Sequence, residues 1–109
     1  MSESLSNKAK TLDRYIMNLP MSKSMNTMSR QEQVAMLDLR DGASMLRVAV
    51  TKYFASDDLD EKRIALEDSV GLVKDLDVFI IEASKLDLLG PVDVAHLSAL
   101  ADSIRERLE

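Results

Sequence analysis

Two long segments, residues 30–55 and 59–86, repeat apolar side chains at alternating intervals of three and four residues, and this periodicity limits the chain to helical folds. The first stripe is Ala35, Leu39, Gly42, Leu46, Ala49 and Tyr53, and the second is Ala65, Leu72, Leu76, Phe79, Ala83 and Leu86. Only the acidic turn "SDDLDE" (56–61) separates them. Because a short turn joins antiparallel neighbours, we expect these helices to pack side by side.

Two shorter segments complete the pattern. Residues 4–19 and residues 92 or 93 to 108 carry similar stripes, and Pro20 and "GP" (90–91) mark breaks beside them. Aromatic residues make up only 4% of the chain, which disfavours a sheet protein. We therefore predict an all-α, antiparallel up-down four-helix bundle that forms a single domain over residues 1–109.

The apolar faces of the two long helices are wider than a small bundle requires. A second set in residues 30–55 flanks the first stripe: Val34, Leu37, Met45 and Val48. Gly42 lies in mid-helix, where glycine costs about 1 kcal/mol relative to alanine, and we expect another backbone to approach it closely. These features predict a homo-oligomer, with Gly42 and Tyr53 as candidate contact residues.

The linker over residues 20–29, within "NLPMSKSMNTMSRQEQ", places Met21, Met25 and Met28 in a polar segment. Their four- and three-residue spacing favours a lid over the end of the bundle. Methionine also suits surfaces that adapt to partners, so contact with a second copy or a partner protein stays open. Ser29 and Glu32 then form a capping box that starts the next helix.

Catalytic motifs are missing from the sequence. It has no Cys, no glycine-rich phosphate loop and a single histidine, His96, which we interpret as a boundary residue. We expect no enzyme, cofactor, metal site or small-molecule substrate. The N-terminus lacks the apolar core of a signal peptide, and no apolar run reaches the roughly 20 residues of a membrane span. These features predict a cytoplasmic protein.

Charge is unevenly distributed along the chain. Residues 1–55 hold 8 Lys and Arg against 5 Asp and Glu, whereas residues 56–109 hold 6 against 14, so the net charge of −5 combines +3 with −8. The overall acidity opposes general nucleic-acid binding, although clustered basic residues could still form a local patch. Asp38 with Asp41, Asp75 with Asp77, and Arg40 with Arg47 flank the apolar stripes. We expect them to pair across helices or to form a polar seam between subunits.

The order of these motifs resembles a known family. "LDRYIMNLP", "VAVTKYF", "LVKDLDVFI" and "ASKLDLLGPVDVAHLSALADSIRERL" follow one another over residues 10–108. This order resembles that of the four-helix-bundle family of diversity-generating-retroelement accessory variability proteins and ribosomal-RNA intervening-sequence proteins. The resemblance implies a homo-pentamer that binds a reverse transcriptase and its template RNA. The basic positions that could serve that role are Arg14, Lys23, Arg30, Arg40 and Arg47. The present chain differs in being acidic and in ending with "RERLE".

The function expected from the sequence is therefore that of a non-catalytic binding or scaffold protein. In its most specific form it is an oligomeric accessory subunit for a protein partner, with RNA or DNA as a further ligand. The acidic half favours an alternative of another class, which is a small inhibitor of phage or mobile-element type. Such a protein would imitate the charge of nucleic acid and block a nucleic-acid-binding protein.

Overall fold

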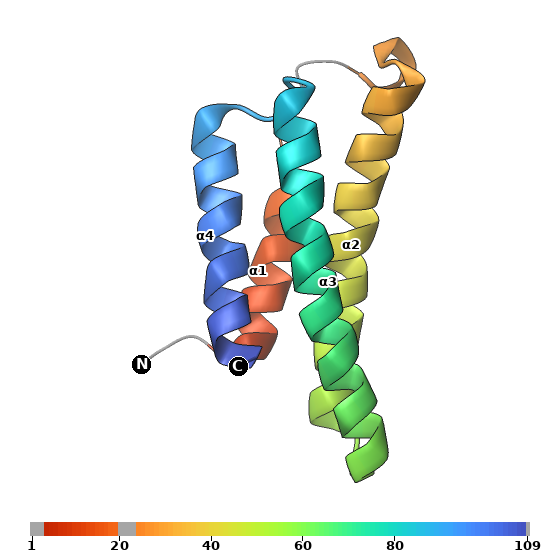
Figure 1. The fold of residues 1–109 in the computed structure, drawn as a ribbon, viewed down its shortest axis with the longest axis vertical. Coiled ribbons are helices and arrows are strands. Elements are labelled where there is room, and N and C mark those ends of the chain that lie inside the picture. The colour runs from red at the N-terminus through yellow and green to blue at the C-terminus, as the bar shows by residue number, and fades with distance from the viewer. Residues whose placement is uncertain (1–3, 20–23, 109) are drawn as a thin grey trace.

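Four antiparallel helices form the fold in the computed structural model, which describes residues 4–19 and 24–108 (Figure 1). They are α1 (Leu5–Met17), α2 (Arg30–Ala55), α3 (Leu59–Lys85) and α4 (Pro91–Leu108), with a short 3₁₀ helix, η1, over Met25–Thr27. The described residues contain no strand. The predicted all-α up-down four-helix bundle is therefore confirmed.

Local sequence explains where the helices start. Ser29 and Glu32 form the predicted capping box, since the Ser29 amide donates to Glu32 Oε1 (3.0 Å) and the Glu32 amide donates to Ser29 Oγ (3.1 Å). Asp58 caps α3 in a similar way, with its carboxylate accepting from the amides of Asp60 and Glu61. Pro91 is the first residue of α4, earlier than predicted, because proline suits the first helical position.

The end of α1 also differs slightly from the prediction. The helix ends at Met17 rather than Leu19, and Asn18 caps it by donating from its backbone amide and from Nδ2 to the Arg14 carbonyl oxygen. Leu19 lies beside Pro20, and a residue that precedes proline is disfavoured in helical geometry. Leu19 still reaches the core, where it is buried.

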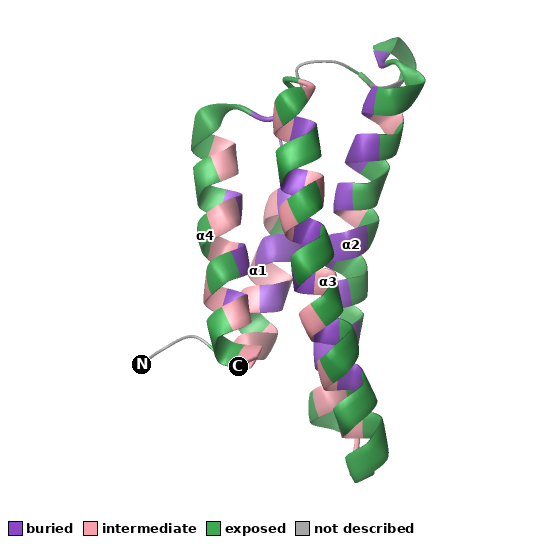
Figure 2. Cartoon of the chain, viewed as in Figure 1, coloured by how far each residue is buried: buried purple, intermediate pink, exposed green. Residues whose placement is uncertain are grey.

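All four helices contribute to one hydrophobic core. Neighbours in the chain pack together, and α1 and α4 close the bundle. Buried residues line the inward faces of the helices (Figure 2). The largest fully buried apolar side chains are Leu12, Ile16, Met36, Leu39, Leu46, Leu76, Ile80, Leu97 and Ile104.

The α2–α3 hairpin is longer than its partners. At 1.5 Å per residue, the 27 residues of α3 span about 40 Å and the 13 residues of α1 only about 20 Å. The turn end of the hairpin therefore extends beyond α1 and α4 (Figure 1). Small side chains let the two helices pack closely there, and buried Ser69 donates from Oγ to the Ala65 carbonyl oxygen at 2.8 Å.

No helix in the described part of the chain combines the length and the apolar character needed to cross a membrane.

Candidate interaction surface

His96 lies in a polar cluster between α1 and α4. The Tyr15 and His96 rings stack with centroids 4.4 Å apart, and the Tyr15 hydroxyl donates to Asp93 Oδ1 at 2.6 Å. This hydrogen bond, partial burial of the phenol and the negative charge of Asp93 all raise the Tyr15 pKa above its ordinary value. The phenol is therefore protonated at neutral pH, and the cluster fastens the end of α1 to the start of α4.

The described residues contain no cluster of side chains suited to bind a metal ion. Between residues 4 and 19 and between 24 and 108, no group of three or more His, Asp or Glu side chains is placed to hold a metal ion.

The five basic candidate residues occupy separate places. Arg14 is exposed on α1 and lines a hollow of about 400 Å³ near Tyr15 and Asp93, while Arg30 is exposed in the first turn of α2. Arg40 is half-buried farther along α2, and its Nε is shielded from solvent. Lys23 lies outside the described residues. The structure therefore does not unite the described members of the set into one basic patch.

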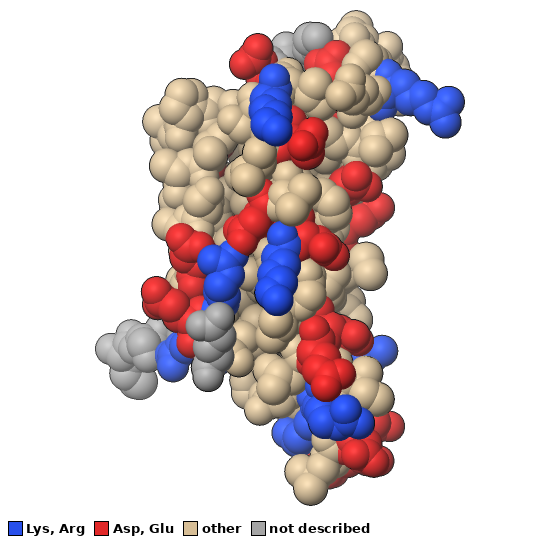
Figure 3. Space-filling view, in the orientation of Figure 1, with Lys and Arg blue, Asp and Glu red and all other residues tan. Residues whose placement is uncertain are grey.

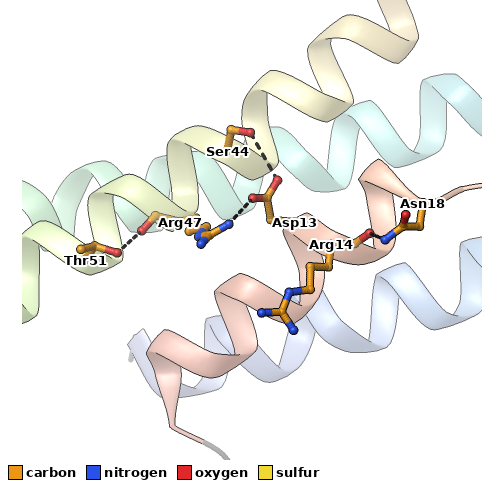
Figure 4. Close-up of polar contacts among 6 residues, drawn as sticks. All are labelled: Asp13, Arg14, Asn18, Ser44, Arg47 and Thr51. Atoms are coloured by element: carbon orange, nitrogen blue, oxygen red, sulfur yellow. Dashed lines mark hydrogen bonds and ion pairs between the residues drawn. The ribbon is translucent and has the colours of Figure 1, made fainter.

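Arg47, the fifth candidate, is engaged within the chain. Asp13 points from α1 toward α2, where its carboxylate accepts from Arg47 Nη1 at 3.1 Å and from Ser44 Oγ at 3.3 Å (Figure 4). The Asp13 side chain is only 10% exposed, whereas that of Arg47 is 43% exposed. This ion pair confirms the expected cross-helix pairing for Arg47, and a role of Arg47 in binding an outside partner stays a prediction that rests on its exposed part.

Met28 agrees with the favoured prediction of a lid. Its side chain is only 6% exposed and packs in the bundle core, so it is part of the lid and is not available as a partner contact. Met21 and the Met25 side chain lie outside the described parts of the structure.

Gly42 is explained by packing inside the chain. It is buried, and a Cβ at this position would lie 3.2 Å from Leu76 Cδ2 and 3.2 Å from Phe79 Cε2 of α3. The expected close approach therefore exists, but side chains of the same molecule make it. Gly42 is not a contact residue between copies.

Tyr53 lies near the hairpin turn. Its carbonyl oxygen accepts from Lys62 Nζ at 3.1 Å, and the same ammonium lies 4.9 Å from the centre of the Tyr53 ring. Phe54 packs edge-on against this ring, with centroids 5.1 Å apart. Tyr53 is half-buried by these neighbours and remains a candidate contact residue only through its exposed part.

The predicted polar pairs have different outcomes. Asp77 forms an ion pair with Arg105 of α4, which also binds Asp102 at 2.7 Å, so cross-helix pairing is confirmed for Asp77. Asp38, Asp41 and Asp75 are exposed instead. They lie on the outward faces of α2 and α3, where water solvates their charge.

One apolar surface on α2 has no cover within the described chain. Val34, Leu37, Met45 and Val48, which we call the α2 stripe, are 46–57% exposed and lie on the face opposite the core. By contrast, the predicted stripe of α3 is buried or half-buried against α2 and α4. Large apolar side chains are also exposed on α3, namely Leu59, Ile64, Val78 and Ile81, but the α2 stripe places four of them on one face.

A groove runs between the outer faces of α2 and α3. It consists of adjoining hollows of about 590 and 400 Å³, which share Lys52, Ala65 and Asp68. We call this feature the α2–α3 groove. Its apolar lining includes Met45, Val48, Ala49, Ala65, Gly71 and Leu72. Acidic residues of α3 lie along its edge. Figure 3 shows acidic side chains interspersed with basic ones over the face formed by the two long helices.

Sequence reasoning missed the importance of Asp13 and of the Tyr15–Asp93 hydrogen bond. Asp13 lies next to Leu12 and three residues before Ile16, at the edge of the α1 stripe. This position at the edge of an apolar stripe is the one sequence feature that indicates burial of Asp13. Nothing local in the sequence indicates that Tyr15 meets Asp93, 78 residues away.

Comparison of the chain with protein-family models, with curated proteins and with solved structures finds no match. Function must therefore be inferred from the surfaces described above.

Proposed function

We propose that this protein is a non-catalytic helical scaffold, a homo-oligomeric accessory subunit that binds a protein partner. The observation that carries the proposal is the α2 stripe, because four large apolar side chains share one outward face of a helix whose other face already fills the core. Large apolar side chains exposed together on one helix face are typical of protein interfaces. Covering it with a second copy would remove it from water and stabilise the assembly.

The resemblance described above extends the proposal to a pentamer with a reverse transcriptase as partner. The order and lengths of the helices support this version. Contact with RNA has weaker support, since Arg47 is paired with Asp13 and the exposed Arg14 and Arg30 lie on different helices. A basic patch would have to be assembled from several copies.

A second candidate function has one observation in its favour. Exposed carboxylates on α2 and α3, including Asp38, Asp41, Asp68 and Asp75, follow the outer face of the long hairpin. A row of negative charges on a rigid helical surface is suited to bind a protein that normally holds nucleic acid. This arrangement supports an inhibitor that imitates nucleic acid.

Self-association can be tested by light scattering coupled to gel filtration. We expect the wild-type protein to elute as an oligomer and Val34→Ser/Leu37→Ser to dissociate toward the monomer, because both substitutions remove apolar surface outside the core. The matched control is Val78→Ser/Ile81→Ser on α3, which should leave the oligomer intact. Helical circular dichroism of each variant checks that the bundle is folded. A wild-type monomer at all concentrations would contradict the proposal.

An RNA mobility-shift titration separates the two candidate functions. An accessory subunit that contacts template RNA should retard it, and added salt should weaken the complex because counterions compete for phosphate. An inhibitor that imitates nucleic acid should leave RNA mobility unchanged at every salt concentration.

A further inference from the structure

We infer that the α2–α3 groove is the docking site for a cationic amphipathic helix of a partner protein. This inference rests on the proposed function, since it describes the chemistry of the partner that the scaffold binds. It concerns a different surface from the Val34–Leu37 end of the α2 stripe, so the two can be tested separately.

The shape and lining of the groove suit a helix. The adjoining hollows follow the outer side of the hairpin from Asp75 and Ser44 toward Ser56 and Glu61. Buried Ala49 and Ala65 form a shallow floor, and exposed Met45 and Val48 stand at its α2 side. An amphipathic helix that lays its apolar face into such a groove would cover these side chains. Methionine adapts its shape to the side chain that it meets.

Gly71 provides an independent reason to expect a close neighbour. It lies in the middle of α3 and is exposed, and a Cβ built on it would meet no atom within 4 Å. Glycine at such a position costs roughly 1 kcal/mol relative to alanine. Gly42 offsets this cost through packing against Leu76 and Phe79, but nothing that the structure describes near Gly71 does so. Because Gly71 lines the groove, a docked helix would be able to approach α3 most closely there.

The charge of the groove selects a basic partner. Four carboxylates line it, namely Glu61, Glu67, Asp68 and Asp75, whereas Lys52 is the only cation among its described lining residues. Glu61 accepts from Ser56 Oγ, and Glu67 pairs with Arg63 at the surface. Asp68 and Asp75 form no ion pair or hydrogen bond with any residue described in the structure. They can therefore receive Lys or Arg side chains from a docked helix.

A second copy of this chain fits the groove less well than a basic partner. The exposed α2 stripe is accompanied by Asp38 and Asp41, which the carboxylates of the groove would repel. α1 carries the basic residue Arg14, but Leu12 and Ile16 of its apolar face are buried in its own bundle. Among the described residues of α1, Met17 is the only large apolar side chain that is exposed, so α1 offers no apolar face to fill the groove.

The test uses synthetic peptides and the full-length protein. One probe is a fluorescent amphipathic helix with leucines along one face and lysines beside them, and its control replaces each lysine by glutamate. In fluorescence anisotropy, we expect the lysine peptide to bind at least about ten-fold more tightly than the glutamate peptide, with a difference that shrinks as salt is added. Equal affinity for the two peptides would overturn the inference.

Substitutions at Gly71 locate the binding site. Gly71→Leu places a side chain in the groove, and its Cβ would meet no protein atom within 4 Å. It should weaken binding of the lysine peptide about ten-fold or more while the bundle stays folded. The matched control, Ala99→Leu, adds the same side chain at an exposed position of α4 and should leave binding unchanged. Unchanged affinity of Gly71→Leu would overturn the inference.

Charge substitutions test the acidic edge. Asp68→Asn/Asp75→Asn should weaken the lysine peptide several-fold, whereas the same change of net charge on α4, Asp102→Asn/Glu106→Gln, should have little effect. Equal loss in both variants would show that only the overall charge matters and would overturn the inference.

Light scattering on the Gly71→Leu variant keeps the two proposals distinct. If this variant dissociates the homo-oligomer, a second copy occupies the groove, so the inference fails while self-association is supported. If the oligomer persists and peptide binding is lost, both proposals are supported. If the wild-type protein is a monomer that binds the lysine peptide at Gly71, self-association fails and the docking inference stands.

Discussion

At the scale of single residues, Asp13 fixes the position of α1 on α2. Its carboxylate is mostly buried and accepts hydrogen bonds from Ser44 and Arg47, which belong to successive turns of the neighbouring helix. A carboxylate removed from water in this way is retained only when its hydrogen bonds are satisfied. The pair therefore sets the register between the helices as well as contributing to stability.

Replacement of Asp13 tests this role. We expect Asp13→Ala to lower the free energy of unfolding by about 1–2 kcal/mol, because it leaves the half-buried Arg47 and the exposed Ser44 hydroxyl without this acceptor. Urea denaturation followed by circular dichroism measures the change. The control is Arg63→Gln, which breaks the exposed pair with Glu67 and should change stability by less than about 0.5 kcal/mol. Similar effects of the two substitutions would contradict this account of Asp13.

At the scale of elements, α2 and α3 each contain a glycine in mid-helix, and the two have opposite surroundings. Gly42 faces Leu76 and Phe79 in the helix interface, whereas Gly71 faces open space in the groove. Helix propensity favours alanine at both sites by a similar amount. The packing of the two helices determines whether replacing glycine by alanine can stabilise the protein at each site.

Alanine and leucine substitutions distinguish these two sites. Gly71→Ala should raise the free energy of unfolding by about 0.5–1 kcal/mol, because it removes the entropic cost of glycine without a clash. Gly42→Ala should gain less, since its Cβ would lie 3.2 Å from Leu76 Cδ2. Gly42→Leu should lower stability by roughly 1–3 kcal/mol through overpacking. Urea denaturation measures these changes. Equal stabilisation by alanine at both sites would show that Leu76 and Phe79 of α3 shift without cost to accommodate a Cβ at position 42.

At the scale of the whole molecule, one part of the bundle is packed by all four helices and the other part by only two. The core is surrounded by four helices, whereas the turn end of the α2–α3 hairpin extends past α1 and α4 (Figure 1). Most of residues 51–64 are exposed, including the large apolar side chains of Phe54, Leu59 and Ile64. Few apolar contacts hold this end together, which favours local opening.

Hydrogen exchange measures this difference. We expect helical amides near the turn, such as those of Phe54 and Lys62, to exchange much faster than amides beside Leu46, Leu76 and Leu97, because the core amides require global unfolding. Addition of the lysine peptide should slow exchange along the groove. Uniform protection over the whole hairpin in the free protein would contradict this expectation.

The periodic segments made the helices predictable. The capping box at Ser29 and Glu32 and the break at Gly90–Pro91 depend on neighbouring residues, so the sequence located helix ends to within two residues. Site residues were harder to predict. Arg47 was a candidate for partner binding but pairs with Asp13. Met28, for which the sequence left partner contact open beside a lid, is buried in the core. Those outcomes depend on residues distant in the chain.

The sequence by itself determined that the chain is a bundle of four helices, because hydrophobic periodicity, caps and breakers act through local backbone geometry. Tertiary structure alone decided which part of each wide apolar face is covered. On α3 the predicted stripe packs against neighbours, whereas Val34, Leu37, Met45 and Val48 of α2 stay in water. A helical pattern shows that residues share a face, but only the positions of the other three helices determine whether that face meets protein or solvent.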